Sequence, residues 1–186
     1  MPFDELNTIR PIVTEIMGHD AEERKRYLDY LEDIVLEVLI LSYLYGNEAA
    51  NYMLAEDIPT VDSKLFKSIH KAVAGETWLE RIRQHLESGT VEDIMRVIVT
   101  ESHRIYNEAM FSTAKAVWDS GAVVFKEWDC MMLPTSRDTH VYLEGDTVPL
   151  NEYFYTYDGD YAMHPGDFVY PENNINCLCR LRLSKA

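Results

Sequence analysis

The stretch that most constrains the fold of this chain is TVEDIMRVIVTESHRIYNEAMFSTAKAVWDSG, residues 90–121. Thr90 followed three residues later by Asp93 is a capping-box pattern, and Gly121 marks a helix end. Between them, apolar residues recur at the spacing of one helix face. They are Ile94, Val97, Ile98, Ile105, Met110, Ala114 and Val117. A helix this long exceeds the usual span of about 8 to 20 residues, so it has to pack on several partners or join two parts of the chain.

The chain before this helix also carries helical patterns. Apolar residues at helical spacing after an acidic start predict a helix over residues 21–45, with the Gly-Asn pair that follows as its end. Two shorter amphipathic helices are predicted, one capped by Ser63 and one running from Thr77 up to Gly89.

The composition changes after Gly121. VVFKEW at residues 123–128 and INCLCRLRL at residues 175–183 have the residue types of strands, and prolines and glycines punctuate the stretch between them. We therefore predict an α+β fold. A helical docking region covers residues 1–121, and a small mixed β module covers residues 122–186 and packs on the long helix.

Composition limits the classes of function. The 32 acidic and 17 basic residues give a net charge of −15, which opposes contact with a phosphate backbone unless the basic groups gather on one face. Three cysteines, an odd number, favour a reducing compartment over a disulfide framework. The first residues lack the pattern of a signal peptide, and the most apolar segment, residues 34–46, is shorter than the roughly 20 residues of a membrane span. The sequence therefore predicts a cytoplasmic protein that does not enter a membrane.

Cys177 and Cys179 lie one residue apart in the last predicted strand. Residues i and i+2 of a strand face the same side, so the two sulfurs would lie about 6 to 7 Å apart, close enough to share a tetrahedral zinc but unsuited to a disulfide with each other. Zinc needs two more ligands, and the nearest candidates are His140 and His164, with Cys130 as a further one. The alternative is that the cysteines pack as small hydrophobic side chains while His140 bonds a backbone carbonyl.

Arg137 and His140 also admit a catalytic interpretation. The arginine could clamp a phosphate or carboxylate while His140 acts as general acid or base, with a cysteine as nucleophile. Against this interpretation, the surrounding stretch is rich in acidic residues, which repel phosphate. A structural ion pair of Arg137 with Asp138, Glu144 or Asp146 is the alternative, and no catalytic residue is assigned.

A further group of polar residues lies on the long helix. Glu101 and Arg104 have the i, i+3 spacing of an ion pair, and Asn107 follows one turn later. We expect these side chains to fasten the helix to the β module.

Several short motifs occur in one order, which is more specific than any of them alone. The order is Thr100-Glu101, Arg104, Asn107, Gly121, Trp128, Arg137-Asp138-Thr139-His140, Leu143, Gly145, Val148-Pro149-Leu150, Phe154, His164-Pro165-Gly166-Asp167 and Asn176-Cys177-Leu178-Cys179. Over about residues 95–183, this order resembles the phage minor head protein family typified by the Mu F head morphogenesis protein. The chain departs from the family pattern at Leu133 and Thr135, which stand where the family has an aspartate and an arginine.

The resemblance implies a virion protein of the capsid interior or portal vicinity that is present in the host cytoplasm during assembly. Its role would be structural, in head assembly or in genome packaging or ejection. The expected partners are the portal protein, the major capsid protein or both, with further copies of the chain itself and direct DNA contact left open. Trp128 and Gly145 join Glu101, Arg104 and Asn107 as structural residues of the expected module.

Two alternatives to this structural, non-enzymatic role stay open. One is a nucleic-acid-processing or toxin-like enzyme that uses Arg137 and His140. The other is a DNA-binding ejection protein with a basic face. The basic residues for that face are Lys64, Lys67, Lys71, Arg81, Arg83, Arg180, Arg182 and Lys185.

Overall fold

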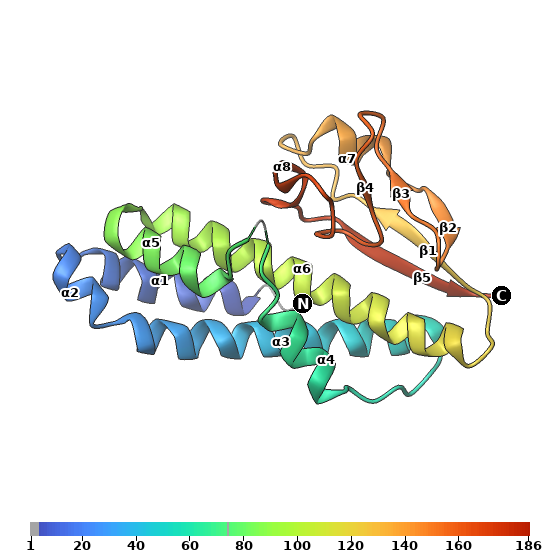
Figure 1. Ribbon diagram of the computed structural model, residues 1–186, viewed down its shortest axis with the longest axis horizontal. Coiled ribbons are helices and arrows are strands. Elements are labelled where there is room, and N and C mark those ends of the chain that lie inside the picture. The colour runs from blue at the N-terminus through green and yellow to red at the C-terminus, as the bar shows by residue number, and fades with distance from the viewer. Residues whose placement is uncertain (1–3, 74) are drawn as a thin grey trace.

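The computed structural model describes residues 4–73 and 75–186. Its axis is a pair of long helices, α3 (Leu28–Leu54) and α6 (Val91–Asp119), which lie side by side and run in the same direction (Figure 1). The other helices of this region pack along the pair. They are α1 (Asp4–Met17), α2 (Ala21–Lys25), α4 (Asp62–Ile69) and α5 (Trp78–Ser88). The β module lies over the C-terminal half of α6 (Figure 1).

Helices α5 and α6 begin with the same local device. Thr77 and Thr90 each accept a hydrogen bond from the backbone N–H three residues later, and the side chains of Glu80 and Asp93 reach back to the N–H of the threonine. These capping boxes satisfy N–H groups that have no partner inside the helix, and they confirm both predicted starts. The predicted end of the long helix is confirmed as well, since Gly121 follows it with a left-handed backbone (φ 103°).

The prediction that a helix ends at Gly46 is wrong. Gly46 lies inside α3, which continues beyond it to Leu54. A Cβ on Gly46 would lie 2.2 Å from the Tyr106 carbonyl oxygen and 2.9 Å from the Ala109 Cβ. The glycine therefore allows a close approach of the backbones of α3 and α6 at this point. Next to this contact, Asn47 Nδ2 donates a hydrogen bond to Thr113 Oγ1 at 2.8 Å.

Other helix boundaries also differ from the predictions. The helix predicted over residues 21–45 is two helices, because Arg26 and Tyr27 separate α2 from α3. Ser63 does not cap α4, since that helix begins one residue earlier and Ser63 lies inside it. The sequence patterns do not predict α1, whose Pro11 removes one donor from the ladder of helix hydrogen bonds.

The β module is built around β1 (Val124–Asp129), the central strand of an antiparallel sheet with the order β2-β1-β5. Strand β5 (Arg180–Lys185) pairs along the whole of β1, and β2 (Thr147–Pro149) pairs with its middle. A separate hairpin and two short helices complete the module. They are β3 (Phe154–Tyr155), β4 (Tyr161–Ala162), α7 (Asp138–Tyr142) and α8 (Pro171–Asn174).

The apolar core of the described residues has two parts. One lies among the helices, and the other combines the β module with the ends of α3 and α6, where Ala50 and Met110 pack with Trp128 and Phe154. Because the module shares its core with the long helices, it is fixed on them rather than tethered by a linker. The predicted α+β class is confirmed. Within the part of the chain that the structure describes, every helix is too short or too polar to cross a membrane.

Candidate metal centre

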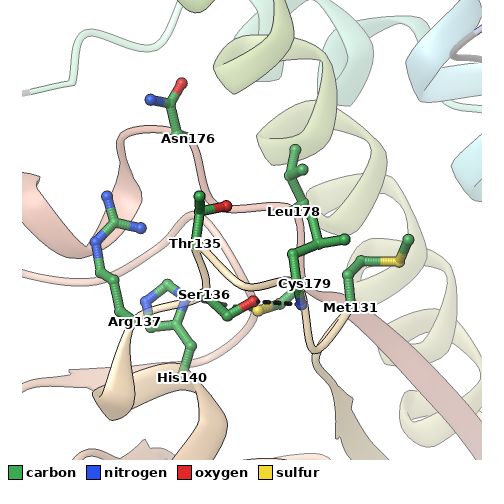
Figure 2. A pocket seen from close by; sticks show the side chains of 9 residues that line it. Met131, Thr135, Ser136, Arg137, His140, Asn176, Leu178 and Cys179 are labelled. Atoms are coloured by element: carbon green, nitrogen blue, oxygen red, sulfur yellow. Dashed lines mark hydrogen bonds between the residues drawn. The ribbon is translucent and has the colours of Figure 1, made fainter.

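Three of the predicted metal ligands meet in the interior of the β module. The ligand atoms of His140, Cys177 and Cys179 lie within 4.8 Å of one another, and all three side chains are buried. His140 Nδ1 is 3.5 Å from Cys179 Sγ, and Figure 2 shows both side chains on the wall of one small pocket. An imidazole and two thiols form a donor set that zinc prefers over magnesium or calcium. The residues therefore form a His/Cys/Cys cluster that can hold a metal ion.

Helix α7 presents His140 to the thiols. Arg137 occupies the N-cap position of α7, and its guanidinium donates a hydrogen bond to the Ile175 carbonyl, just before the cysteines. The His140 ring stacks on Phe168 with centroids 5.3 Å apart, and it meets the Trp128 ring edge-on at 5.9 Å. These rings hold the imidazole in one orientation. The partner of Arg137 is thus a carbonyl group and not one of the carboxylates that the sequence analysis expected.

The two cysteines precede β5 rather than lie within it. Asn107 of α6 binds this segment at two points, donating from Nδ2 to the Cys179 carbonyl and accepting at Oδ1 from the Leu181 N–H, each at 3.0 Å. Upstream, the Asn176 N–H donates to Thr100 Oγ1 at 3.0 Å, and Asn176 has a left-handed backbone (φ 55°). The two sulfurs lie within 4.8 Å of each other, closer than the roughly 6 to 7 Å expected of a regular strand.

The two thiols are electrostatically coupled. Hydrogen bonding to the Cys179 side chain lowers the pKa of Cys177, with the Cys179 backbone and Arg137 acting in the same direction against the effect of burial. The same contact between the side chains, together with burial, raises the pKa of Cys179. The two thiols therefore do not lose their protons independently, and a divalent cation that binds both sulfurs has to displace both protons.

His164 lies apart from this cluster. Its ring packs on Phe111 of α6 with centroids 5.5 Å apart, its Nδ1 is 3.1 Å from the Pro165 carbonyl oxygen, and burial lowers its pKa. Gly166, the next residue but one, has a φ of 87°, and a Cβ on it would lie 3.0 Å from the Arg104 Cα. The loop therefore lies against α6 and does not bring His164 to the other three predicted ligands.

Glu101 and Arg104 form the ion pair that their spacing predicts, with 2.8 Å between Arg104 Nη2 and Glu101 Oε2, and both are buried. Their further partners lie mainly in the helical region. Arg81 Nη2 is 2.5 Å from Glu101 Oε1, and Arg104 donates to the Ser68 carbonyl and to Glu108, each at 2.8 Å. This buried network joins α4, α5 and α6, whereas Asn107 is the residue of the group that binds the strand segment.

Trp128 and Gly145 shape the start of the sheet. The Trp128 ring is fully buried, with its centroid 5.2 Å from that of Phe154 and 5.3 Å from that of Phe168. The Trp128 carbonyl accepts from the Gly145 N–H and the Trp128 N–H donates to the Asp146 carbonyl, both at 2.9 Å. Gly145 has a φ of 77°, which other residues rarely adopt. Together they fix the turn that leads into β2.

Asp160 is a buried residue in the turn-rich stretch between the predicted strands. Its carboxylate accepts hydrogen bonds from the N–H groups of Tyr161, Val169 and Tyr170 and from the Asn173 side chain, at 2.7 to 3.3 Å. The Asp-Gly-Asp sequence gives no local sign of this, because the donors come from a later loop.

Lys126 is a second buried charged residue that sequence reasoning does not identify. Its Nζ donates to the Met163 carbonyl at 2.6 Å and lies 4.9 Å from the ring centroid of Phe154. Burial lowers the pKa of Lys126 to about 7. The alternation of buried and partly buried residues along β1 is the pattern that indicates the burial of Lys126, because Lys126 lies on the same buried face as Val124 and Trp128.

A small cavity lies beside the metal-binding cluster. It has a volume of about 30 Å³ and is lined by residues that include Met131, Ser136, Arg137, His140 and Cys179 (Figure 2). A volume of this size holds little more than a water molecule. His140 itself is only 2% exposed. The arrangement can therefore bind a metal ion or a single small ligand, but it offers no room for a polymer substrate.

Comparisons of the chain with protein-family models, with curated proteins and with solved structures give no match.

Proposed function

We propose that this protein is a minor head protein of a phage particle, with a structural role in head assembly or in genome packaging or ejection. The helical region docks on the portal protein or the major capsid protein, and the β module is a compact unit held on the long helices. The protein acts in the capsid interior or near the portal, and it occupies the host cytoplasm during assembly.

The convergence of the motifs behind the family resemblance is the observation that supports this proposal. Thr100 and Asn107 of α6 bind the segment of residues 175–181, and Arg137 and His140 of the β module contact the same segment. Residues that match a family pattern by chance have no physical reason to lie together in the fold. Residues that build one module are expected to lie together, because the contacts among them specify the fold.

The enzyme alternative requires Arg137 and His140 to face a substrate. His140 is 2% exposed, and the Arg137 guanidinium already bonds the Ile175 carbonyl. The cavity between them, about 30 Å³, is too small for a nucleotide. These contacts favour a structural role for both residues.

The DNA-binding alternative requires a free basic face. Several of the basic side chains meet carboxylates instead. The pairs are Lys71–Asp167, Arg81–Glu101, Arg182–Glu127, Arg182–Asp129 and Lys185–Glu56. Since the whole chain also carries a net charge of −15, this pairing favours a protein partner over a phosphate backbone.

The proposal includes zinc as a structural ion in the His/Cys/Cys cluster. If the cysteines served only for packing, His140 would be expected to bond a backbone carbonyl. Instead its Nδ1 faces the Cys179 thiol, and its Nε2 is buried without a hydrogen-bond partner among the described residues. A buried imidazole whose one polar neighbour is a thiol fits ligation of zinc through Nδ1.

Co-expression with the portal and major capsid proteins encoded in the same genome tests the proposed function. We expect the chain to co-sediment with portal rings or with assembled heads, because both are the proposed docking partners. Alanine at Tyr52 or Phe66, which are 87% and 64% exposed on the helical region, should weaken that association. Tyr155→Ala, at a side chain 61% exposed on the β module, is the matched control and should not.

Three results would argue against the structural role. They are a complete lack of association with either partner, cleavage of nucleic acid that is lost in His140→Ala, and duplex binding that falls steeply with salt.

A further inference from the structure

We propose that the outer face of the β3–β4 hairpin is a docking site for an arginine-rich segment of another protein. Exposed tyrosines form this surface, which we call the tyrosine face. They are Tyr142, Tyr153, Tyr155, Tyr157 and Tyr161. The helical docking region of the proposed function is a different part of the fold, so the two proposals can fail separately.

The backbone of the hairpin directs these rings outward. Along residues 153–157, Phe154 and Thr156 are buried, whereas the tyrosines beside them are 42% to 61% exposed. Successive side chains of a strand point to opposite faces, so Phe154 packs into the core of the module while the tyrosines face solvent. Tyr161 lies opposite Tyr155 in the register of the hairpin. In Figure 1, the hairpin and α7 lie on the side of the module that is farther from α3.

Contacts between the rings make the tyrosine face continuous. The ring centroids of Tyr153 and Tyr161 are 5.1 Å apart, and that of Tyr155 lies 6.3 Å from the first and 6.1 Å from the second. Tyr142 of α7 meets Tyr157 edge-on at 5.6 Å. Tyr155 and Tyr157 point to the same side of the chain, which joins the two groups. Rings that support one another lose little conformational freedom when a partner binds.

Exposed carboxylates without a cationic partner accompany the tyrosine face. Asp138 lies one helical turn before Tyr142 on α7, and Asp158 directly follows Tyr157. In the described parts of the chain, neither of these carboxylates forms an ion pair, and nor does the exposed Glu152. The acids of the module that do form ion pairs there are Glu127, Asp129 and Asp167. The surface around the tyrosines is therefore negative and open to a cation.

Arginine is the residue that fits both the rings and the carboxylates. Its planar guanidinium stacks on tyrosine rings and donates hydrogen bonds to carboxylates, whereas the lysine ammonium is a strongly hydrated point charge. Between Glu127 and Glu172 the sequence has one basic residue, Arg137, and its guanidinium bonds the Ile175 carbonyl. The complementary positive charge is therefore expected from a partner.

The charge and the size of the tyrosine face argue against other occupants. The phosphates of a nucleic acid would meet carboxylates that repel them. A second copy of the chain carries the same net charge of −15, so two copies repel each other. A folded partner contacts about 20 to 30 residues on each side, far more than this face offers, whereas a few aromatic rings can anchor a short extended segment.

Fluorescence anisotropy of the full-length chain tests the proposal at about 0.15 M salt, with a labelled peptide of alternating arginine and glycine as the probe. A peptide with lysine in place of each arginine measures the attraction that depends on charge alone. We expect the arginine peptide to bind more tightly than the lysine peptide. Tyr155→Ser and Tyr157→Ser should each weaken its binding by about 2- to 5-fold, because each removes one ring and no charge.

Two control variants separate the rings of the face from tyrosines in general. Tyr155→Phe keeps the ring and should keep the affinity. Tyr52→Ser removes an exposed tyrosine on α3 and should leave the affinity unchanged.

Three results would overturn the proposal. They are an arginine peptide that does not bind or binds no better than the lysine peptide, an equal loss of binding in Tyr52→Ser, and self-association of the chain that is lost in Tyr155→Ser. The last would show that a second copy occupies the face. None of them bears on the docking of the helical region, for which a change at Tyr155 is expected to have no effect.

Discussion

The two ends of the molecule are held together by different kinds of interaction. The end built from α1, α2, α5 and the first halves of α3 and α6 encloses a core made mostly of leucine, isoleucine and valine side chains. The β module has a smaller core around Trp128, Phe154 and Phe168, to which the three cysteines belong. Stability at the helical end is therefore spread over many similar contacts, whereas the module depends on a few specific side chains.

Asparagine side chains show how the module compensates for its small core. Asn174 clamps Phe168 at both its N–H (2.9 Å) and its carbonyl (2.7 Å), and this holds the ring that stacks on His140. Asn107 clamps the segment after the cysteines in the same two-point manner. Asn174 bonds a loop residue, and Asn107 bonds the backbone just before β5 and at the outer side of that edge strand, so each amide satisfies groups that no neighbouring strand satisfies.

Removal of the zinc proposed for the His/Cys/Cys cluster should have the largest effect and should act on one end only. We expect a chelator to destabilise the β module by about 4 kcal/mol or more, because binding energy of a structural zinc is folding energy. Hydrogen exchange should rise in residues 124–185 and stay low in α5 and the first half of α6. Equal loosening of both ends, or none, would show that the module does not depend on an ion.

Gly46→Ala should be the most damaging single change in the helical region. The new Cβ meets the Tyr106 carbonyl at 2.2 Å, so α3 and α6 have to separate, at a cost of about 3 kcal/mol. Thermal unfolding measures the loss, about 6 to 12 °C for a chain of this size. Gly18→Ala, whose Cβ would lie 3.2 Å from the Glu15 carbonyl, is the control and should change little.

Asn107→Leu should cost about 2 to 4 kcal/mol, because it leaves the Cys179 carbonyl and the Leu181 N–H buried without their partner. Asn51→Leu, near the end of α3, is the matched change at a second two-point clamp. Asn51 clamps the N–H and carbonyl of Ile58 at 2.9 Å each, but at a partly buried site, so we expect a cost of about 1 kcal/mol. Chemical denaturation gives both values, and equal losses would show that burial does not decide how much such a two-point clamp contributes.

Lys126→Met should have the smallest effect and should depend on pH. The pKa of Lys126 is lowered to about 7 by burial, below its ordinary value, so the unfolded chain binds more protons than the folded one between pH 7 and about 10. The stability of the unaltered chain relative to the variant should therefore rise with pH over this window. Denaturation of both proteins at pH 6, 8 and 10 checks the sign, and a difference that does not change with pH contradicts it.

Local signals in the sequence predict where two helices begin, but they do not predict contacts between segments that are distant in sequence. The starts of α5 and α6 are readable because each capping box lies within four residues of sequence. The prediction for Gly46 is wrong because the sequence does not distinguish a glycine that ends a helix from a glycine at a close contact between two helices. Only the position of the second helix, α6, shows which of the two it is. Lys126 is hidden for a related reason, since only the register of β1 against the core shows that it is buried.

The sequence predicts the residues of the metal-binding cluster only in part. The spacing of Cys177 and Cys179 marks them as ligands of one site, but the choice between His140 and His164 is invisible in the sequence. That choice is made by distant aromatic rings, since Phe168 stacks on His140 whereas Phe111 packs on His164. The turn at Asn176, just before the two cysteines, is also held from outside the module, by Thr100 of α6.

The pairing of β1 with β5 has a consequence for the order in which the chain folds. Every other element of the module lies between these two strands in the sequence, so a long loop has to close before they pair. Contacts so distant in sequence form slowly, after local helices have assembled. Until then the thiols of Cys130 and Cys179 stay apart and open to oxidation, and the pairing of the two strands buries both of them.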